Sequence, residues 1–170
     1  DDPNIGVVTS IIALVLGLVS YSTKGYEEAP VKAIQLLTKL AFSKERKSIY
    51  RYYLTLCPWL QVKCLRLLQY FPPPSNKDIL ARLNHVLNDI LTKTAITKNI
   101  NKNNADHSIL FEALNVIIHY CMHNEKELQN NAVGLLGRFI SIREPNFRYL
   151  GLDTMTRFAS IPGSLVTIKK

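Results

Sequence analysis

The hydrophobic pattern along the chain predicts two alternating kinds of helix. One kind is apolar around most of its circumference and must be covered on more than one side. Helices of this kind are predicted near residues 5–20, 58–71 and 108–122. The other kind carries a single apolar stripe at three- and four-residue steps, as expected of a helix with one buried face. Helices of this kind are predicted near residues 30–42, 78–94 and 125–141.

The spacing of the one-sided helices indicates a repeat. They begin at about residues 30, 78 and 125, so the intervals are 48 and 47 residues. A period of roughly 40–47 residues made of paired helices is typical of HEAT and armadillo repeats, and we therefore predict an all-α superhelix (solenoid) of about seven to eight helices in antiparallel pairs. The pairs are expected near residues 5–42, 58–96, 106–141 and 145–170.

The segment 57–74 contains the helix that we expect at the centre of the stack. Pro58 suits a first helical turn, and the prolines at 72–74 end the helix abruptly. If Trp59 is fully buried there, its truncation to alanine would cost about 3–5 kcal/mol. The predicted structural core comprises Trp59, Leu60, Leu65, Leu67, Leu68, Phe111, Leu114 and Phe139.

Two polar or small-residue patterns give further local expectations. The segment 97–106 is rich in Asn and Lys and is expected to be a mobile surface loop, with the next helix opening at Ser108. Gly134 and Gly137 lie inside a predicted helix, where each costs about 1 kcal/mol against alanine. We therefore expect a neighbouring helix to approach closely at these two glycines.

The uncharged segment 3–23 raises the question of a membrane span. Its longest unbroken apolar run, at residues 11–19, has nine residues, whereas a span needs about 18 or more. No basic stretch precedes it, as a signal peptide would require. We therefore expect a buried helix in this segment.

The composition indicates a globular protein. The chain has 170 residues, of which 47% are hydrophobic and 20% charged, as expected of one globular domain with a core. It does not begin with Met, and residues 163–170 look like the start of another helix, so we expect residues 1–170 to be a single fragment of a longer chain. The three cysteines lie in apolar segments, as reduced and buried thiols would.

The net charge of +8 admits three explanations. It fits an uneven slice of a larger protein, a surface that faces a membrane, or a nucleic-acid partner. No nucleic-acid motif accompanies the dispersed charges, so no nucleic-acid partner is predicted. The densest basic cluster is a candidate contact for anionic lipid headgroups, at about 1 kcal/mol per basic side chain, and the alternative is a solvated connector between helices. This cluster comprises Lys44, Arg46, Lys47 and Arg51.

Candidate chemistry is sparse. His119 and His123 are four residues apart and share a helix face, as two zinc ligands would. However, Tyr120 stands where a metalloprotease has its glutamate, and Cys121 points away from the shared face. No nucleophile turn, phosphate loop or carboxylate pair is recognisable. We therefore predict no catalytic residue, no metal site and no cofactor, and a protein that is not an enzyme.

The segment 50–74 closely resembles the alpha-adaptins, the large subunits of the plasma-membrane clathrin adaptor complex. Large adaptor and coatomer subunits carry a Pro-x-Leu-Gln-Val-x-x-Leu-Arg-Leu-Leu segment, which matches residues 58–68 here. The combination of Trp59 with the triple proline is similar to the alpha branch. Three further stretches agree with the family, at residues 6–9, 109–119 and 136–150.

The resemblance implies a helical trunk segment in an assembly with a second large, a medium and a small adaptor subunit. It implies a scaffold for cargo selection and clathrin-coated vesicle formation in endocytosis, cytoplasmic and peripheral at plasma-membrane coated pits. The family's phosphoinositide and cargo-signal sites lie outside this segment, so no site residue is transferred. Two alternatives stay open: the large subunit of a Golgi or endosomal adaptor, and a HEAT-repeat scaffold unrelated to vesicle coats.

Overall fold

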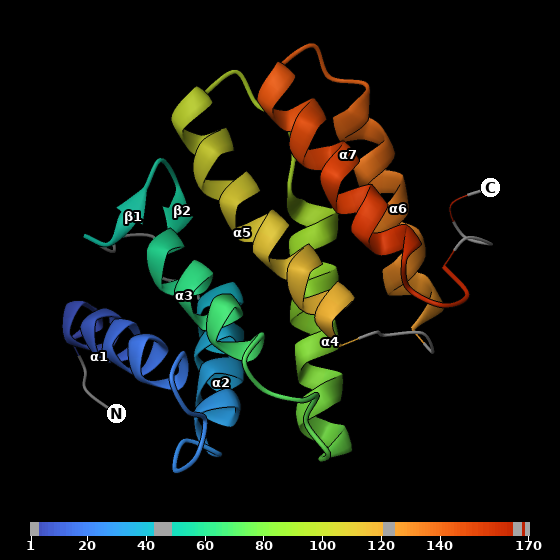
Figure 1. Ribbon diagram of the computed structural model, residues 1–170. Helices are drawn as coiled ribbons and strands as arrows, with labels where there is room; N and C mark the ends of the chain where they lie inside the picture. Colours follow the sequence, from blue (N-terminus) through green and yellow to red (C-terminus); the bar gives the residue numbers. More distant parts are fainter. Residues whose placement is uncertain (1–3, 43–48, 121–124, 165–167, 169–170) are drawn as a thin grey trace.

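The computed structural model describes residues 4–42, 49–120, 125–164 and 168. Seven α-helices and one short hairpin follow one another through these residues (Figure 1). The helices are α1 (Ile5–Val19), α2 (Ala29–Ala41), α3 (Pro58–Leu68), α4 (Lys77–Lys93), α5 (Ile100–His119), α6 (Lys126–Ile140) and α7 (Pro145–Ala159). The strands are β1 (Arg51–Tyr52) and β2 (Thr55–Leu56). The remaining part of the predicted final helix, at residues 165–167 and 169–170, lies outside the described residues.

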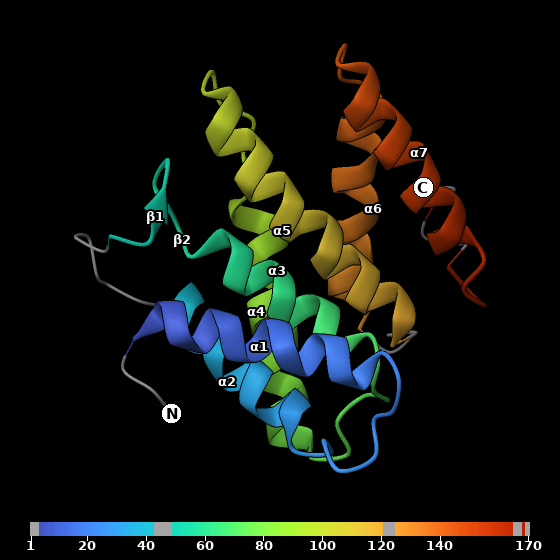
Figure 2. The ribbon, with the colours of Figure 1, turned by 60° about the vertical axis from the view of Figure 1, so that its left-hand side comes forward.

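The helices form two rows that stack against each other. One row contains α1, α3, α5 and α7, which contact one another in that order, and the other contains α2, α4 and α6 (Figures 1 and 2). The rows are joined where α2 packs on α3, α4 on α5, and α6 on α7. This arrangement buries the apolar stripes of successive helices against their neighbours, as in α-solenoids. The predicted all-α solenoid of the HEAT/armadillo type is therefore confirmed.

Helix starts follow the local signals in the sequence. The side chains of Asn4, Asn76 and Asn99 accept hydrogen bonds from backbone N–H groups in the first turns of α1, α4 and α5. These bonds satisfy donors that have no partner within the helix. Pro58 and Pro145 occupy the first positions of α3 and α7, where a missing N–H costs nothing.

The loop expected at residues 97–106 is wrong, because α5 begins at Ile100. Asn103 in this segment has a buried side chain with a structural role. Its Oδ1 accepts hydrogen bonds of 2.8 Å from both the backbone N–H and the hydroxyl of Thr97, and its Nδ2 donates to the Thr97 carbonyl at 2.7 Å. The polar residues therefore cap and brace the start of a helix.

Most of the predicted core residues are buried. Leu60, Leu65, Leu67, Leu68, Leu114 and Phe139 lie in the main hydrophobic core. Phe111 is only half-buried, at the edge of that core. The prediction for Trp59 is wrong, since 59% of this residue is exposed. Trp59 lies in the first turn of α3, where its ring contacts that of Tyr52 in β1.

Helix α1 is less covered than expected. It packs against α3 and buries Ile12 and Val19, but large apolar side chains stay exposed on its other side. These exposed residues are Val7, Ile11, Leu14 and Leu18. No helix in the described part of the chain is long and apolar enough to cross a membrane.

The close helix contact expected at Gly134 and Gly137 occurs instead at Gly151. A Cβ added at Gly134 or Gly137 would meet nothing within 4 Å. A Cβ added at Gly151 in α7 would lie 3.2 Å from the Cβ of Phe139 and 3.4 Å from the backbone N of Ile140, both in α6. The absence of a side chain at Gly151 therefore lets α7 pack tightly on α6.

The C-terminal ends of α3 and α5 are joined by hydrogen bonds. The Tyr120 hydroxyl donates to the Leu68 carbonyl at 3.0 Å, and Nε2 of His119 lies 3.0 Å from the Phe71 carbonyl oxygen. Carbonyls at a helix end lack partners within the helix, and the Leu68 carbonyl also accepts a hydrogen bond of 3.2 Å from the Phe71 backbone N–H. Burial raises the pKa of Tyr120 to about 12. His119 thus has a structural contact, while His123 and Cys121 lie outside the described residues.

Tyr120→Phe is expected to lower the free energy of opening of α3 by about 0.5–1.5 kcal/mol, because the Leu68 carbonyl loses one of its two hydrogen bonds and keeps the one from the Phe71 backbone N–H. Hydrogen exchange of the α3 amides in the complete parent protein measures this change. Tyr21→Phe is the matched control, since Tyr21 is 93% exposed. Equal effects of the two substitutions would contradict the role assigned to Tyr120.

Candidate functional site

A two-residue turn with unusual backbone geometry lies just before α3. It joins β1 and β2, which pair antiparallel. Tyr53 and Leu54 form the turn with φ angles of 45° and 77°, and Cys57, after β2, has φ of 45°. Two-residue hairpins commonly need positive φ at both turn positions, which Gly and Asn adopt most easily. Here bulky residues occupy them, so the hairpin carries local backbone strain.

Contacts with two helices hold this hairpin. Nε2 of the buried Gln61 in α3 donates to the Leu56 carbonyl at 2.6 Å. The Thr55 hydroxyl donates to the Asp106 carboxylate in α5, which also forms an ion pair with Lys102. These side chains come from three separate segments, so the hairpin is positioned by tertiary contacts.

The hairpin supports a row of three aromatic rings that ends at Trp59. The rings of Tyr52 and Trp59 meet edge to face, with centroids 5.0 Å apart. Tyr52 meets Tyr53 in the same way at 4.8 Å. Trp59 and Tyr53 are 59% and 46% exposed, whereas Tyr52 between them is more buried. We call Tyr52, Tyr53 and Trp59 the aromatic row.

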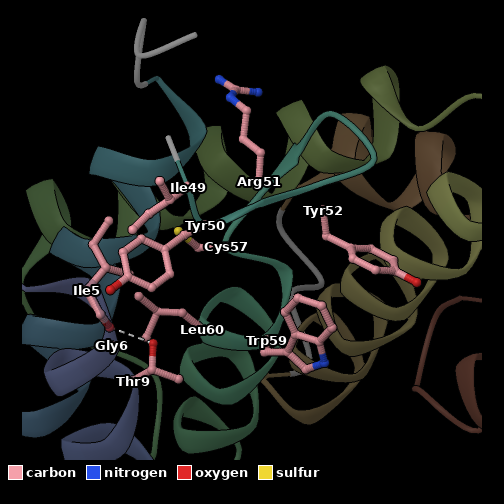
Figure 3. A pocket seen from close by; sticks show the side chains of 10 residues that line it. All are labelled: Ile5, Gly6, Thr9, Ile49, Tyr50, Arg51, Tyr52, Cys57, Trp59 and Leu60. Atoms are coloured by element: carbon pink, nitrogen blue, oxygen red, sulfur yellow. Dashed lines mark hydrogen bonds between the residues drawn. The ribbon is translucent and has the colours of Figure 1, made fainter. Parts of the chain in front are cut away.

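Two hollows flank the aromatic row, and Tyr52 and Trp59 line both. The first hollow, of about 470 Å³, lies between α1, the hairpin and α3 (Figure 3). Its other lining residues are Ile5, Gly6, Thr9, Ile49, Tyr50, Arg51, Cys57 and Leu60. The second hollow, of about 670 Å³, lies between α3, α5 and α7 and includes Lys63, Arg66 and Phe111 in its walls.

Only one member of the predicted lipid-binding cluster lies among the described residues. The Arg51 guanidinium donates to the Leu54 carbonyl at 2.8 Å and lines the first hollow. Lys44, Arg46 and Lys47 lie outside the described residues. Headgroup contact by this cluster therefore stays a prediction.

His107 lies in the wall of the second hollow and is the most unusual titratable group among the described residues. It is 2% exposed, and neither ring nitrogen has a hydrogen-bond partner. Its ring meets those of Phe139 and Phe147 edge to face, at centroid distances of 4.8 and 4.6 Å. Burial lowers the pKa of His107, which the neighbouring Asp106 partly offsets. The imidazole is thus held as a neutral ring among aromatic side chains.

The stability of α5 is expected to fall as the pH falls below about 6.5. The unfolded chain takes up the His107 proton near the usual pKa of 6.5, whereas the folded state resists it to lower pH. The unfolded state therefore binds more protons in this window, and stability increases with pH until it levels off above 6.5. Hydrogen exchange of the α5 amides, corrected for intrinsic exchange rates, measures this slope.

Two substitutions test the source of that slope. His107→Leu should flatten it, because the titrating group is gone. His85→Leu, at an exposed histidine that stacks on Phe42, should leave it in place. A slope that survives His107→Leu would show that other groups cause it.

The described residues offer little to a metal or a nucleophilic reaction. They contain no group of three His, Cys, Asp or Glu residues placed to hold a metal ion. Cys57 and Cys64 are buried, and burial raises the pKa of the Cys64 thiol to about 12. A thiol with so high a pKa is a poor nucleophile, because the thiolate is the reactive form.

The sequence pattern at residues 50–74 predicted a buried central helix in this region and did not predict an exposed site. It predicted Trp59 as core, and it did not predict the hairpin, the aromatic row or the hollows. The only sequence signal for an exposed site was the density of aromatic residues at positions 50–59 next to basic side chains.

Comparison with known proteins places the chain in a family. Residues 1–169 match the family described as adaptin N terminal region. The chain is 44% identical over 170 residues to AP-2 complex subunit alpha-1 of Arabidopsis thaliana, which covers 100% of this chain and 17% of that protein. It is 40% identical over 173 residues to AP-2 complex subunit alpha-2 of Dictyostelium discoideum, with the same coverage of both chains.

A more distant relative is a subunit of a different adaptor complex, AP-4. The chain is 24% identical over 155 residues to AP-4 complex subunit epsilon-1 of Mus musculus, which covers 91% of this chain and 13% of that protein. The chain thus spans less than a fifth of the length of each of these relatives. Its similarity to alpha subunits extends over its whole length. The chain therefore belongs to the adaptin N-terminal region family.

Proposed function

We propose that this chain is a scaffold segment in the large subunit of a clathrin adaptor complex of the plasma-membrane type. The observation that carries the proposal is the 44% identity over the whole chain to a protein named as an AP-2 alpha subunit. Identity to the AP-4 epsilon subunit is 24%, which favours the alpha branch over an endosomal adaptor. The alternative of a HEAT scaffold unrelated to vesicle coats is disfavoured by the family match.

The proposed role is mechanical and does not include catalysis. Two rows of helices give a stiff stack, because each helix from α2 to α7 is held by neighbours in both rows. Such a stack keeps distant parts of the parent subunit at fixed separations. The subunit would thereby support cargo selection and clathrin-coated vesicle formation during endocytosis.

The proposed partners are a second large, a medium and a small adaptor subunit. Phosphoinositide membrane and cargo signals would bind through parts of the parent protein outside this segment. The location would be cytoplasmic and peripheral, at plasma-membrane coated pits.

Affinity purification of the complete parent protein from its own cells tests the proposal, with mass spectrometry as the readout and the tag alone as the control. We expect recovery of the second large, medium and small subunits of the plasma-membrane adaptor. Recovery of an endosomal adaptor set would favour that rival. Recovery of no coat subunit would overturn the proposed function.

A further inference from the structure

We propose that the aromatic row and its two hollows bind an acidic peptide segment of a partner protein that carries large apolar side chains. Together with Lys63 and Arg66, the aromatic row forms what we call the Trp59 surface. This site is separate from the adaptor assembly proposed above and does not depend on it.

The first argument is the exposure of a rigid aromatic group. A tryptophan with more than half of its surface in water does little for the core and is costly to leave solvated. Trp59 nevertheless has a defined environment, because Tyr52 packs edge-on against its ring. Exposed, pre-positioned Trp and Tyr side chains are the residues that most often dominate binding energy at protein interfaces.

The second argument is the shape of the surface beside Trp59. Both hollows fall within the range of about 300–1,000 Å³ that is usual for binding sites. The first hollow has mainly apolar walls, including Ile5, Tyr50 and Leu60 (Figure 3). An extended peptide places successive side chains on opposite sides, so it can set apolar side chains into hollows on both sides of Trp59. A bilayer surface has no such projections, and this favours a peptide over a membrane.

The third argument is charge. The described charged residues in the walls of the hollows are Arg51, Lys63, Arg66 and Glu112. Glu112 accepts hydrogen bonds from Nε of Arg66 at 2.6 Å and from Nε2 of Gln69 at 2.9 Å, so its charge is already compensated. Lys63 forms no ion pair with any carboxylate among the described residues. The positive charge of Lys63 is therefore available in the wall, and it complements an acidic segment.

The fourth argument is the strained hairpin. Tyr53 and Leu54 adopt positive φ angles that side chains of this size rarely take. The hydrogen bonds of Thr55 with Asp106 in α5 and of the Leu56 carbonyl with Gln61 in α3 maintain this conformation. The result is that Tyr53 is presented next to Tyr52 and extends the row to the hairpin tip. Strain that the surrounding structure maintains is concentrated at binding sites.

A selection of random peptides on the complete parent protein tests the proposal. We expect enriched peptides to combine Trp, Phe or Leu with Asp or Glu. Trp59→Ala should weaken their binding roughly tenfold or more, as for a residue that dominates an interface. Lys63→Glu should weaken binding and reduce its salt dependence. Tyr21→Ala and Lys24→Glu, at exposed positions outside both hollows, are the matched controls and should leave affinity unchanged.

Three results would overturn the proposal. The first is a selection that enriches no peptide, or only peptides that bind Trp59→Ala as tightly as the unchanged protein. The second is enrichment of peptides without acidic residues, which Lys63→Glu then binds equally well. The third is binding to anionic phosphatidylserine vesicles that Trp59→Ala abolishes while no peptide competes, which would assign the surface to a membrane. Hydrogen exchange of α3 in each variant establishes that the fold is retained.

Discussion

Leu67→Ala is expected to lower the free energy of opening of α3 by about 2–5 kcal/mol. Leu67 is fully buried in the main core, at the middle of the row formed by α1, α3 and α5. Its truncation removes buried apolar surface and leaves a cavity that the packed neighbours fill only in part. Because both neighbouring helices rest on α3, the change should also reach amides in α5. Hydrogen exchange of α3 and α5 in the complete parent protein measures the effect.

Trp59→Ala is the informative comparison, because it removes a larger side chain from the same helix. Its cost is expected to stay near 1 kcal/mol, since most of Trp59 is already in contact with water and its edge contact with Tyr52 is a weak one. The order of the two effects is the test. A cost of Trp59→Ala that equals or exceeds that of Leu67→Ala would mean that Trp59 belongs to the core.

The difference between these two residues shows where the hydrophobic pattern cannot predict which side chains are buried. Helix α3 is apolar around most of its circumference, so its pattern has no single stripe that marks a buried face. Which apolar side chains are covered then depends on where α1, α2 and α5 lie. Leu67 lies within their contacts and Trp59 lies at the end of α3 beside the hairpin. For a one-sided helix such as α4, the apolar stripe was sufficient, and Leu83 and Leu87 are buried as its period predicts.

Helix boundaries were predictable where the deciding contacts are local. An asparagine such as Asn76 caps the helix that follows it by bonding to residues two and three positions further on. The segment at 97–106 was not predictable in this way, because several asparagines occur together. Only the structure shows that Asn99 caps α5 while Asn103 braces Thr97.

The candidate site could not be predicted because its parts come from distant segments. The hairpin turn is Tyr53–Leu54, which lacks the Asn-Gly or Asp-Gly signal of two-residue turns. Its conformation depends on Thr55 meeting Asp106, a contact across 51 positions of sequence. The hollows likewise need walls from α1, α5 and α7. The sequence supplied the aromatic residues, and tertiary packing determined that they face outward.

Phe139→Ala is expected to lower the free energy of opening of α6 and α7 by about 3–5 kcal/mol. Phe139 is almost fully buried, and its ring contacts those of His107, Phe111 and Phe147 at centroid distances of 4.8, 5.4 and 6.0 Å. These partners belong to α5 and α7, so one side chain joins three helices. Truncation of a buried phenylalanine costs this much because the cavity cannot collapse fully. Hydrogen exchange of the α6 and α7 amides in the complete parent protein provides the measurement.

Phe42→Ala is the matched control for this prediction. Phe42 stacks on His85 at 4.9 Å and lies 5.8 Å from Nζ of Lys93, but 41% of the residue is exposed. Its loss should cost about 1 kcal/mol or less, because exposed ring contacts of this kind are weak. If both substitutions had the same small effect, α6 and α7 would be held together mainly by other contacts, such as the close approach at Gly151. A large effect confined to Phe139→Ala would identify its ring as the link between α5, α6 and α7, and it would place the neutral His107 inside that link.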